Sequence, residues 1–181
     1  MKFRLTTSWL AVMGLALWGC SGAPSPARLI WTSQPAVSEA HNALFRAAIE
    51  PRKEEWPYFT HFLLTLENRS DAPMTVDWNA SRYVFDGKPQ GVLVFEGIDP
   101  QAVGSSSVPS EAVAPGAVFT REVMPLRLIA WTPVRQKTLK ARSITPGMFP
   151  AGTNGVRMVV RHAGGALTIP LSVRISARDA P

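Results

Sequence analysis

Residues 62–78 read Phe-Leu-Leu-Thr-Leu-Glu-Asn-Arg-Ser-Asp-Ala-Pro-Met-Thr-Val-Asp-Trp, and this stretch decides the fold class. Apolar side chains take every second position from Phe62 to Leu66, and again from Met74 to Trp78. The polar segment between them is rich in Asn, Ser, Asp and Pro, which favour turns. Because successive side chains of a strand point to opposite faces, the pattern predicts two half-buried β-strands joined by a turn.

The C-terminal part of the chain repeats this pattern. Apolar and polar residues alternate over residues 156–161 and 167–175, and Ala163-Gly164-Gly165 lies between the two runs. These features predict a β-hairpin. Pro170 cannot donate a hydrogen bond to a neighbouring strand, which favours an edge position or a bulge there.

Weaker strand signals extend along the rest of the chain. Two of them are residues 82–85, with a return at 91–95 after Asp86-Gly87, and residues 118–123. Three more have an alternative: residues 41–49 (strand, alternatively helix), residues 28–32 (strand, alternatively tether) and residues 126–131 (strand, alternatively a helical turn). Residues 97–115 are rich in Ser, Pro, Val and Ala and predict a long loop. No stretch predicts a helix of ten or more residues, so the chain is expected to be an all-β, antiparallel sandwich or barrel.

The N-terminus has a different character. A charged start is followed by a short apolar run over residues 9–18, which ends in Leu17-Trp18-Gly19-Cys20. The run is too short to span a bilayer and is typical of a secretory signal peptide. Its end resembles the lipobox of bacterial lipoproteins, with Trp18 bulkier than the usual residue. The resemblance implies that Cys20 is acylated and becomes the mature N-terminus; the alternative is an ordinary secretory peptide with an incidental cysteine.

This interpretation divides the chain into three parts. Residues 1–19 are a lipoprotein signal peptide, residues 20–36 a lipidated N-terminus with a flexible tether, and residues 37–178 one β-sandwich domain. The tether begins with small, polar and Pro-containing sequence. The chain has one cysteine, Cys20, so the exported domain is expected to depend on burial and not on disulfides.

A second resemblance concerns the domain itself. Residues 62–79, with the Pro115-Gly116 turn, the strand after it and Met124-Pro125, resemble a group of uncharacterised bacterial outer-membrane lipoproteins with an immunoglobulin-like β-sandwich. The resemblance covers about residues 58–176 and implies that fold behind a lipid anchor; it offers no catalytic residues. Because the cysteine pair of antibody domains is missing, Trp78 is expected to pack against aliphatic side chains alone.

Charge is distributed unevenly along the chain. Residues 21–120 contain seven Lys or Arg and eleven Asp or Glu, whereas residues 121–181 contain ten and two. The strand pattern places Arg157, Arg161 and Arg174 on faces opposite the core. They form either a basic strip for anionic partners or a simple solvated face.

The tryptophans are candidates for core packing or for a binding surface for glycans, peptides or lipids. Trp78 shares the parity of Met74 and Val76 and is predicted to be buried. Trp56, between Glu55 and Pro57, is the candidate for exposure and binding.

The sequence shows no strong catalytic or metal-binding pattern. The run Gly104-Ser105-Ser106-Ser107 lacks the second glycine of a hydrolase nucleophile elbow, and the three histidines are far apart in sequence. His61 and Asp77 are the most suggestive acid–base pair, since both are expected to point outwards from neighbouring strands. That pairing requires the two strands to share a sheet, which consecutive strands of an immunoglobulin-like sandwich do not always do. The covalent lipid on Cys20 is the one cofactor expected.

These observations predict a non-enzymatic, lipid-anchored structural or interaction module of the bacterial cell envelope, accessory to an envelope complex. Ser21, in place of aspartate, favours the outer membrane facing the periplasm by analogy with known lipoproteins. The expected partners are the membrane and an envelope protein, not nucleic acid. Two alternatives stay open. One is an envelope hydrolase or ligand carrier using His61, Asp77 and the serine loop; the other is a binder of anionic polymers or lipid headgroups through the basic half.

Overall fold

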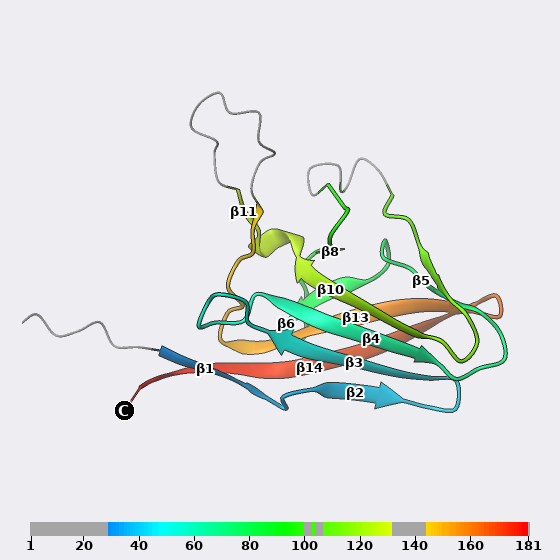
Figure 1. The fold of residues 1–181 in the computed structure, drawn as a ribbon, viewed down its shortest axis with the longest axis horizontal. Coiled ribbons are helices and arrows are strands. Elements are labelled where there is room, and N and C mark those ends of the chain that lie inside the picture. The colour runs from blue at the N-terminus through cyan, green and yellow to red at the C-terminus, as the bar shows by residue number, and fades with distance from the viewer. Residues whose placement is uncertain (1–28, 100–102, 104–106, 132–143, 181) are drawn as a thin grey trace, which may run out of the picture.

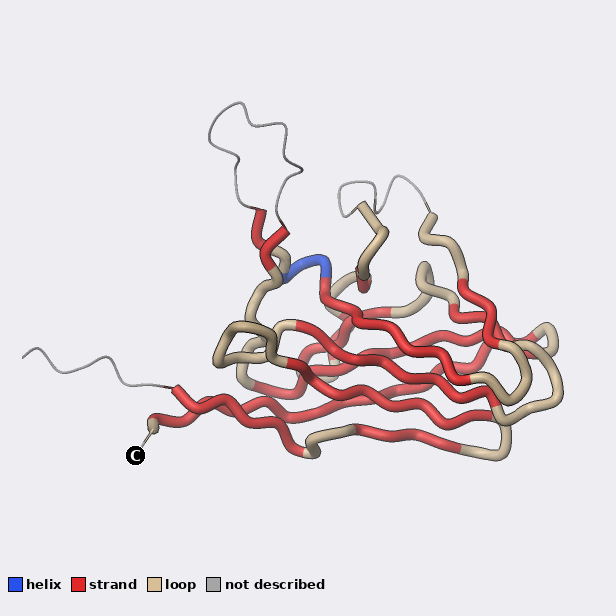
Figure 2. The backbone as a smooth tube through the Cα atoms, viewed as in Figure 1, coloured by secondary structure: helices blue, strands red, loops and turns tan. Residues whose placement is uncertain are grey.

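The computed structural model describes residues 29–99, 103, 107–131 and 144–180. Over these residues the regular secondary structure is β-strand, apart from one short 3-10 turn at Leu126–Leu128 (Figure 2). Two antiparallel sheets are stacked, with β3, β4 and β10 in front of β13 and β14 in Figure 1. The predicted all-β, antiparallel sandwich is therefore confirmed.

The larger sheet has seven strands within the described residues. Its path is β1 (Leu29–Gln34), β14 (Gly165–Asp179), β13 (Gly152–His162), β5 (Met74–Val76) and β9 (Glu111–Val113), with β6 (Arg82–Phe85) also paired to β13 and β7 (Lys88–Pro89) paired to β6. The smaller sheet has the order β2 (Ser38–His41), β3 (Phe45–Arg52), β4 (His61–Asn68), β10 (Val118–Pro125) and β8 (Leu93–Val94). A separate pair joins β11 (Ala130–Trp131) to β12 (Ile144–Thr145).

The core lies between the two sheets and follows the parity predicted from the sequence. Each long strand buries alternate apolar side chains, which include Phe62, Leu64 and Leu66 of β4, Val156, Met158 and Val160 of β13, and Ile169, Leu171, Val173 and Ile175 of β14. Trp78 is buried as predicted, but its ring packs against Phe95 and Phe119 at centroid distances of 4.9 and 6.2 Å. The expectation of purely aliphatic neighbours for Trp78 is thus wrong.

The decisive stretch, residues 62–78, crosses from one sheet to the other. β4 belongs to the smaller sheet and β5 to the larger one. The buried amide of Asn68 holds this crossover: its nitrogen donates to the carbonyl oxygens of Ala72 and Val113, and its oxygen accepts from Ser70. Because an unpaired buried amide is costly, this complete pairing favours one path for the turn.

The β13–β14 hairpin forms as predicted. Ala163 and Gly164 both have positive φ, at 48° and 78°, as a two-residue hairpin turn requires. Pro170 also fits its predicted place. β1 pairs only with residues 174–179 of β14, so Pro170 is paired with β13 on one side and, among the described residues, has no paired strand on the other.

Three predicted segments differ from the structure. The chain beyond Asp86-Gly87 pairs with β6 only as far as Gly91; β8 then pairs with β10 of the other sheet, so residues 91–95 are not one returning strand. Residues 111–113, inside the predicted loop 97–115, form β9 because they pair with β5. Residues 29–34 form β1, which agrees with the strand alternative for residues 28–32 and differs from the division that assigned residues 20–36 to the tether.

The weakly predicted strand at 41–49 is divided by a turn. β2 ends at His41 and β3 begins at Phe45. The Asn42 side chain accepts hydrogen bonds from the backbone N–H groups of Leu44 and Phe45, which closes the turn between them. Residues 126–131 contain both predicted alternatives, a helical turn followed by strand β11.

Candidate functional site

The outer surface of the larger sheet carries a group of arginines, which we call the arginine face. Its members take the outward positions of their strands: Arg82 of β6, Arg157 and Arg161 of β13, and Arg174 and Arg178 of β14. All but Arg178 follow a buried residue of the chain, and Arg178 lies four positions beyond Arg174 on the same face. The predicted outward placement of Arg157, Arg161 and Arg174 agrees with this pattern. Arg82 and Arg178 join them because of strand pairing that the sequence does not display.

The arginine face is a row along the length of the sheet. Arg82 lies directly opposite Arg157 on the neighbouring strand. Arg161 is four residues along β13 in one direction, and Arg174 lies opposite Thr153, four residues in the other. At a rise of about 3.3 Å per residue, successive positions in the row are about 13 Å apart. A linear partner with regularly spaced negative groups therefore matches the row.

Most of this charge has no acidic partner in the described residues. Arg161 is the exception, since its guanidinium donates to the Asp77 carboxylate at 2.7 and 3.0 Å. No salt bridge is formed by Arg82, Arg157, Arg174 or Arg178 within the part of the chain that the structure describes. Arg82 and Arg157 take directly opposed positions on neighbouring strands, an arrangement that is unfavourable for like charges. The Arg82 guanidinium donates to the carbonyl oxygens of Asn79 and Ser81, at 2.6 and 2.7 Å, which partly offsets this.

Asp77 is held in its charged form. Burial alone would raise the pKa of its carboxyl, but hydrogen bonds from Arg161 and from the backbone N–H of Ala80, with the positive charge of Arg161, hold that pKa below its usual value. The carboxylate therefore stays an acceptor and is poorly suited to act as a general acid.

A hollow of about 290 Å³ opens on the arginine face beside Arg157. Gly155 forms its floor, where a Cβ atom would lie 2.3 Å from the carbonyl oxygen of Leu171. Because Gly155 has no side chain, the surface is depressed between Val84, Pro170 and Ser172. The hollow gives a partner on this face a place for one small group next to a guanidinium.

Trp56 is 44% exposed, as predicted, and lies outside the arginine face. Its ring stacks on Tyr58, with centroids 5.6 Å apart and an angle of 12° between the planes. Trp56, Tyr58, Leu29, Trp31 and Met148 surround a second hollow of about 670 Å³.

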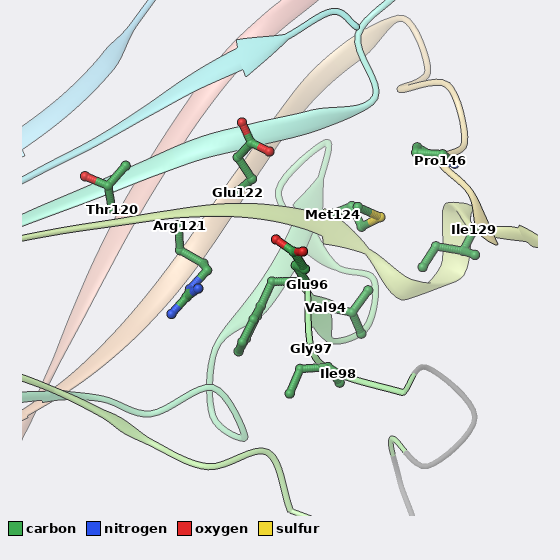
Figure 3. Close-up of a pocket in the computed structure, with 11 residues that line it drawn as sticks. Val94, Glu96, Gly97, Ile98, Thr120, Arg121, Glu122, Met124, Ile129 and Pro146 are labelled. Atoms are coloured by element: carbon green, nitrogen blue, oxygen red, sulfur yellow. The ribbon is translucent and has the colours of Figure 1, made fainter. Parts of the chain in front are cut away.

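A third pocket, of about 510 Å³, lies where β10 meets the segment after β8 (Figure 3). Its apolar wall contains Val94, Met124 and Ile129, and its charged groups are Glu96, Arg121 and Glu122. Arg121 and Glu122 leave β10 on opposite sides, as their alternate positions on one strand require (Figure 3). The pocket thus combines apolar surface with more acidic than basic side chains.

Arg121 already has partners inside the protein. Its guanidinium pairs with Glu111 of β9 and lies 5.1 Å from the ring centre of Phe95, while Glu111 also accepts a hydrogen bond from Trp78 Nε1 at 2.9 Å. β9 and β10 belong to different sheets, so this network ties the two sheets together along one side. We interpret Arg121 as a structural link and not as an anion receptor.

The predicted acid–base pair of His61 and Asp77 is not brought together. The two residues belong to different sheets, and Asp77 is engaged by Arg161. His61 has the outward parity expected of it, but it is only 3% exposed because Glu54 and Glu122 lie over it, at 3.7 Å from Nδ1 and 3.8 Å from Nε2. The prediction that both groups are available on an outer face is wrong, since neighbouring side chains bury them.

Several predicted features lie outside the described residues. These include Cys20, the signal peptide and most of the tether, and Gly104-Ser105-Ser106 of the serine loop. Among the residues that are described, no helix is long and apolar enough to cross a membrane. Within the same residues, no three His, Cys, Asp or Glu side chains cluster in a way that could hold a metal ion.

Comparisons with known proteins do not extend this description. No protein-family model, no curated protein and no solved structure matches the chain.

Proposed function

We propose that this chain is a lipid-anchored, non-enzymatic interaction module of the bacterial cell envelope, accessory to an envelope complex. The observation that carries the proposal is the position of Cys20 relative to the folded domain. β1 begins at Leu29, so residues 21–28 separate the sheet from a cysteine that follows a signal-like apolar run. A lipid on Cys20 would hold the sandwich close to a membrane, and Ser21 favours the outer membrane facing the periplasm.

The immunoglobulin-like type of sandwich is part of this proposal. It is supported by two stacked antiparallel sheets and by a chain whose described strands change from one of these sheets to the other six times, after β1, β4, β7, β8, β9 and β10. Trp78 packs in the core without a disulfide, within an aromatic group. Such sandwiches leave the outer faces of both sheets free for partners.

The arginine face is the surface on which we place the interaction. It is exposed, its members are held on paired strands, and four of its five arginines have no acidic partner in the described residues. Rigid strands keep the spacing of the guanidinium groups fixed, which lowers the cost of ordering them on binding.

The anchoring is tested by changing Cys20 to serine in the full chain expressed in a two-membrane bacterium. We expect the unaltered chain to sediment with the membranes and its N-terminal peptide to show an acyl mass on Cys20. The Cys20→Ser chain should lose most of its membrane fraction. An unmodified Cys20, or a Cys20→Ser chain that stays on the membrane to the same extent, would contradict the proposal.

A second candidate function is binding of anionic envelope polymers, and the Arg82–Arg157 juxtaposition specifically favours it. Phosphate groups on lipopolysaccharide or carboxylates on peptidoglycan would relieve the repulsion between these guanidinium groups. Because such an interaction is electrostatic, it is expected to weaken as salt rises from about 0.05 to about 0.5 M, where the Debye length becomes shorter than the spacing of the row. Pull-down of the full chain by lipopolysaccharide across that salt range checks it, and binding unaffected by salt would argue against it.

A further inference from the structure

One end of the sandwich exposes apolar and aromatic side chains around a hollow, and we call it the aromatic end. Its members are Leu29, Trp31, Trp56, Tyr58 and Met148. Leu29, Trp56 and Met148 are 44%, 44% and 45% exposed, whereas Trp31 is buried against the core. A cluster of large exposed apolar side chains is unusual on a soluble surface and marks a site of interaction.

The aromatic end is held in place by the surrounding structure. The loop that carries Trp56 joins β3 to β4, and its base is closed by a hydrogen bond from the Thr60 N–H to the Arg52 carbonyl oxygen at 3.1 Å. Lys53 Nζ donates to the carbonyl oxygen of Trp31 at 2.6 Å and thereby fixes the loop to β1. The exposure of Trp56 therefore belongs to an ordered loop, with its ring already stacked on Tyr58.

This end is also where the chain leaves the sandwich towards Cys20. The start of β1, the β3–β4 connection and the C-terminus lie at the same end of the molecule, on the left in Figure 1. Nine residues of extended chain span at most about 30 Å, so a lipid on Cys20 cannot be farther than that from Leu29. Any membrane that holds the lipid is within reach of the aromatic end.

We propose that the aromatic end docks against the boundary between headgroups and acyl chains of the bilayer that holds the Cys20 lipid. The inference rests on the proposed lipid anchoring. Trp and Tyr rings favour this boundary because they combine an apolar body with a polar N–H or O–H group.

Charge around the aromatic end indicates that apolar contact drives the docking. Glu55 lines the hollow, while Lys53 is engaged with Trp31 and lies 4.6 Å from the ring centre of Phe59. Among the described residues that line the hollow, Glu55 is the one charged side chain, so none of them directs positive charge at anionic headgroups. Docking should therefore occur on zwitterionic lipid and should respond weakly to salt, unlike binding at the arginine face.

The test uses the full chain purified with its lipid and reconstituted into phosphatidylcholine vesicles whose acyl chains carry bromine, which quenches nearby tryptophan fluorescence. We expect the Trp56→Phe chain to show at least twofold less quenching than the unaltered chain. Met148→Ser should weaken quenching of Trp56 by a smaller factor, and Val118→Ser should leave it unchanged. Val118 is the matched control, because it is an apolar residue 62% exposed and lies outside the aromatic end.

The mass of the N-terminal peptide, measured on the same sample, separates the two proposals. If Cys20 is acylated but quenching is equal in the Trp56→Phe and unaltered chains, the docking is overturned and the anchoring stands. If Cys20 is not acylated, the anchoring fails and the docking fails with it. A blue shift of Trp56 fluorescence with N-acetylglucosamine oligosaccharides, in place of quenching by brominated lipid, would also overturn the docking and identify a glycan site.

Discussion

The two outer faces of the sandwich differ in whether their arginines are paired with acidic side chains. On the smaller sheet, arginines have acidic neighbours: Arg46 pairs with Glu39 at 2.8 Å, Arg52 with Glu50 at 2.9 Å and Arg69 with Glu67 at 2.9 Å. On the larger sheet, the arginine face has one such pair, between Arg161 and Asp77, among the described residues. One face neutralises itself, whereas the other keeps positive charge available for a partner.

This difference between the faces shows how the unevenly distributed charges of the sequence are arranged in the fold. Ion pairs on exposed strands contribute little stability, so the smaller sheet does not need its acids to fold. Their effect is to cancel local charge. The larger sheet places Arg82 opposite Arg157 with no acidic side chain paired to either among the described residues, although Arg82 donates to the carbonyl oxygens of Asn79 and Ser81.

The largest expected effect is a loss of stability when a side chain is removed from the core between the two sheets. Phe149 is fully buried, with its ring centre 4.5 Å from that of Phe62 in the smaller sheet and 6.1 Å from that of Tyr83 in the larger one. Phe149→Ala should lower the free energy of unfolding by about 3–5 kcal/mol, through lost burial and the cavity left behind. Urea denaturation measures this loss, and Val118→Ala, at an exposed position, is the control.

If the Phe149→Ala change costs no more than the Val118→Ala change, the two sheets do not form one core through this ring. A single transition reported equally by far-UV circular dichroism and by tryptophan fluorescence would support one cooperative unit.

Strand parity predicted much of this core but not Phe149. Alternation identifies Phe62 and Val156 as buried because each strand has its own period of two. Phe149 lies outside any strand, after Pro146-Gly147, where no periodicity indicates a direction. Its ring packs against residues of both sheets, and its N–H donates to the carbonyl oxygen of Phe59 in the β3–β4 connection at 2.8 Å.

The candidate site was predictable to a similar extent. The outward direction of Arg157 follows from its neighbours in sequence, whereas the position of Arg82 beside it depends on pairing between strands about 75 residues apart, a non-local contact of the kind that sheets require. His61 shows the opposite case. Its parity was correct, yet Glu54 and Glu122 cover it, and no local pattern reports such covering.

The next largest effect is expected on binding, when charges are reversed on the arginine face. Arg157→Glu combined with Arg174→Glu reverses two charges of the arginine face. We expect affinity for purified lipopolysaccharide to fall at least about tenfold at low salt, since both attraction and steering are lost. Co-sedimentation or fluorescence titration measures the affinity.

The matched control is Arg46→Glu combined with Arg69→Glu on the smaller sheet, which changes net charge by the same amount. It should shift affinity by less than about threefold, because its charges lie on the other face and act mostly through screened, long-range fields. Equal losses in the two double variants would show that total charge, and not the arginine face, determines binding.

A smaller effect on stability is expected at the one ion pair of the arginine face. Asp77→Asn should lower the free energy of unfolding by about 1 kcal/mol at neutral pH, because Arg161 is largely exposed and the pair is partly screened. Since the pKa of Asp77 is lowered in the folded state, its contribution is complete above the usual aspartate pKa. It is lost as the pH falls through the lower, folded value. Thermal unfolding at pH 7 and at about pH 3 should therefore show a difference between the two chains that shrinks in acid, and a difference that grows in acid would contradict this assignment.

The smallest effect is expected at the Glu39–Arg46 pair, and it sharpens the comparison most. Both side chains are about half exposed, so Glu39→Gln should leave the unfolding midpoint unchanged. The same change removes the ion pair of Arg46 and leaves it with Glu67, directly opposite on β4, as its acidic neighbour, so its charge is only partly uncovered. If spacing along a row matters more than isolated charge, affinity for lipopolysaccharide should rise by less than about twofold, since one cation adds a single weak contact. A rise in affinity as large as the loss caused by the Arg157 and Arg174 reversals would mean that any exposed, unpaired arginine can bind lipopolysaccharide. The two faces would then differ only in their number of unpaired arginines.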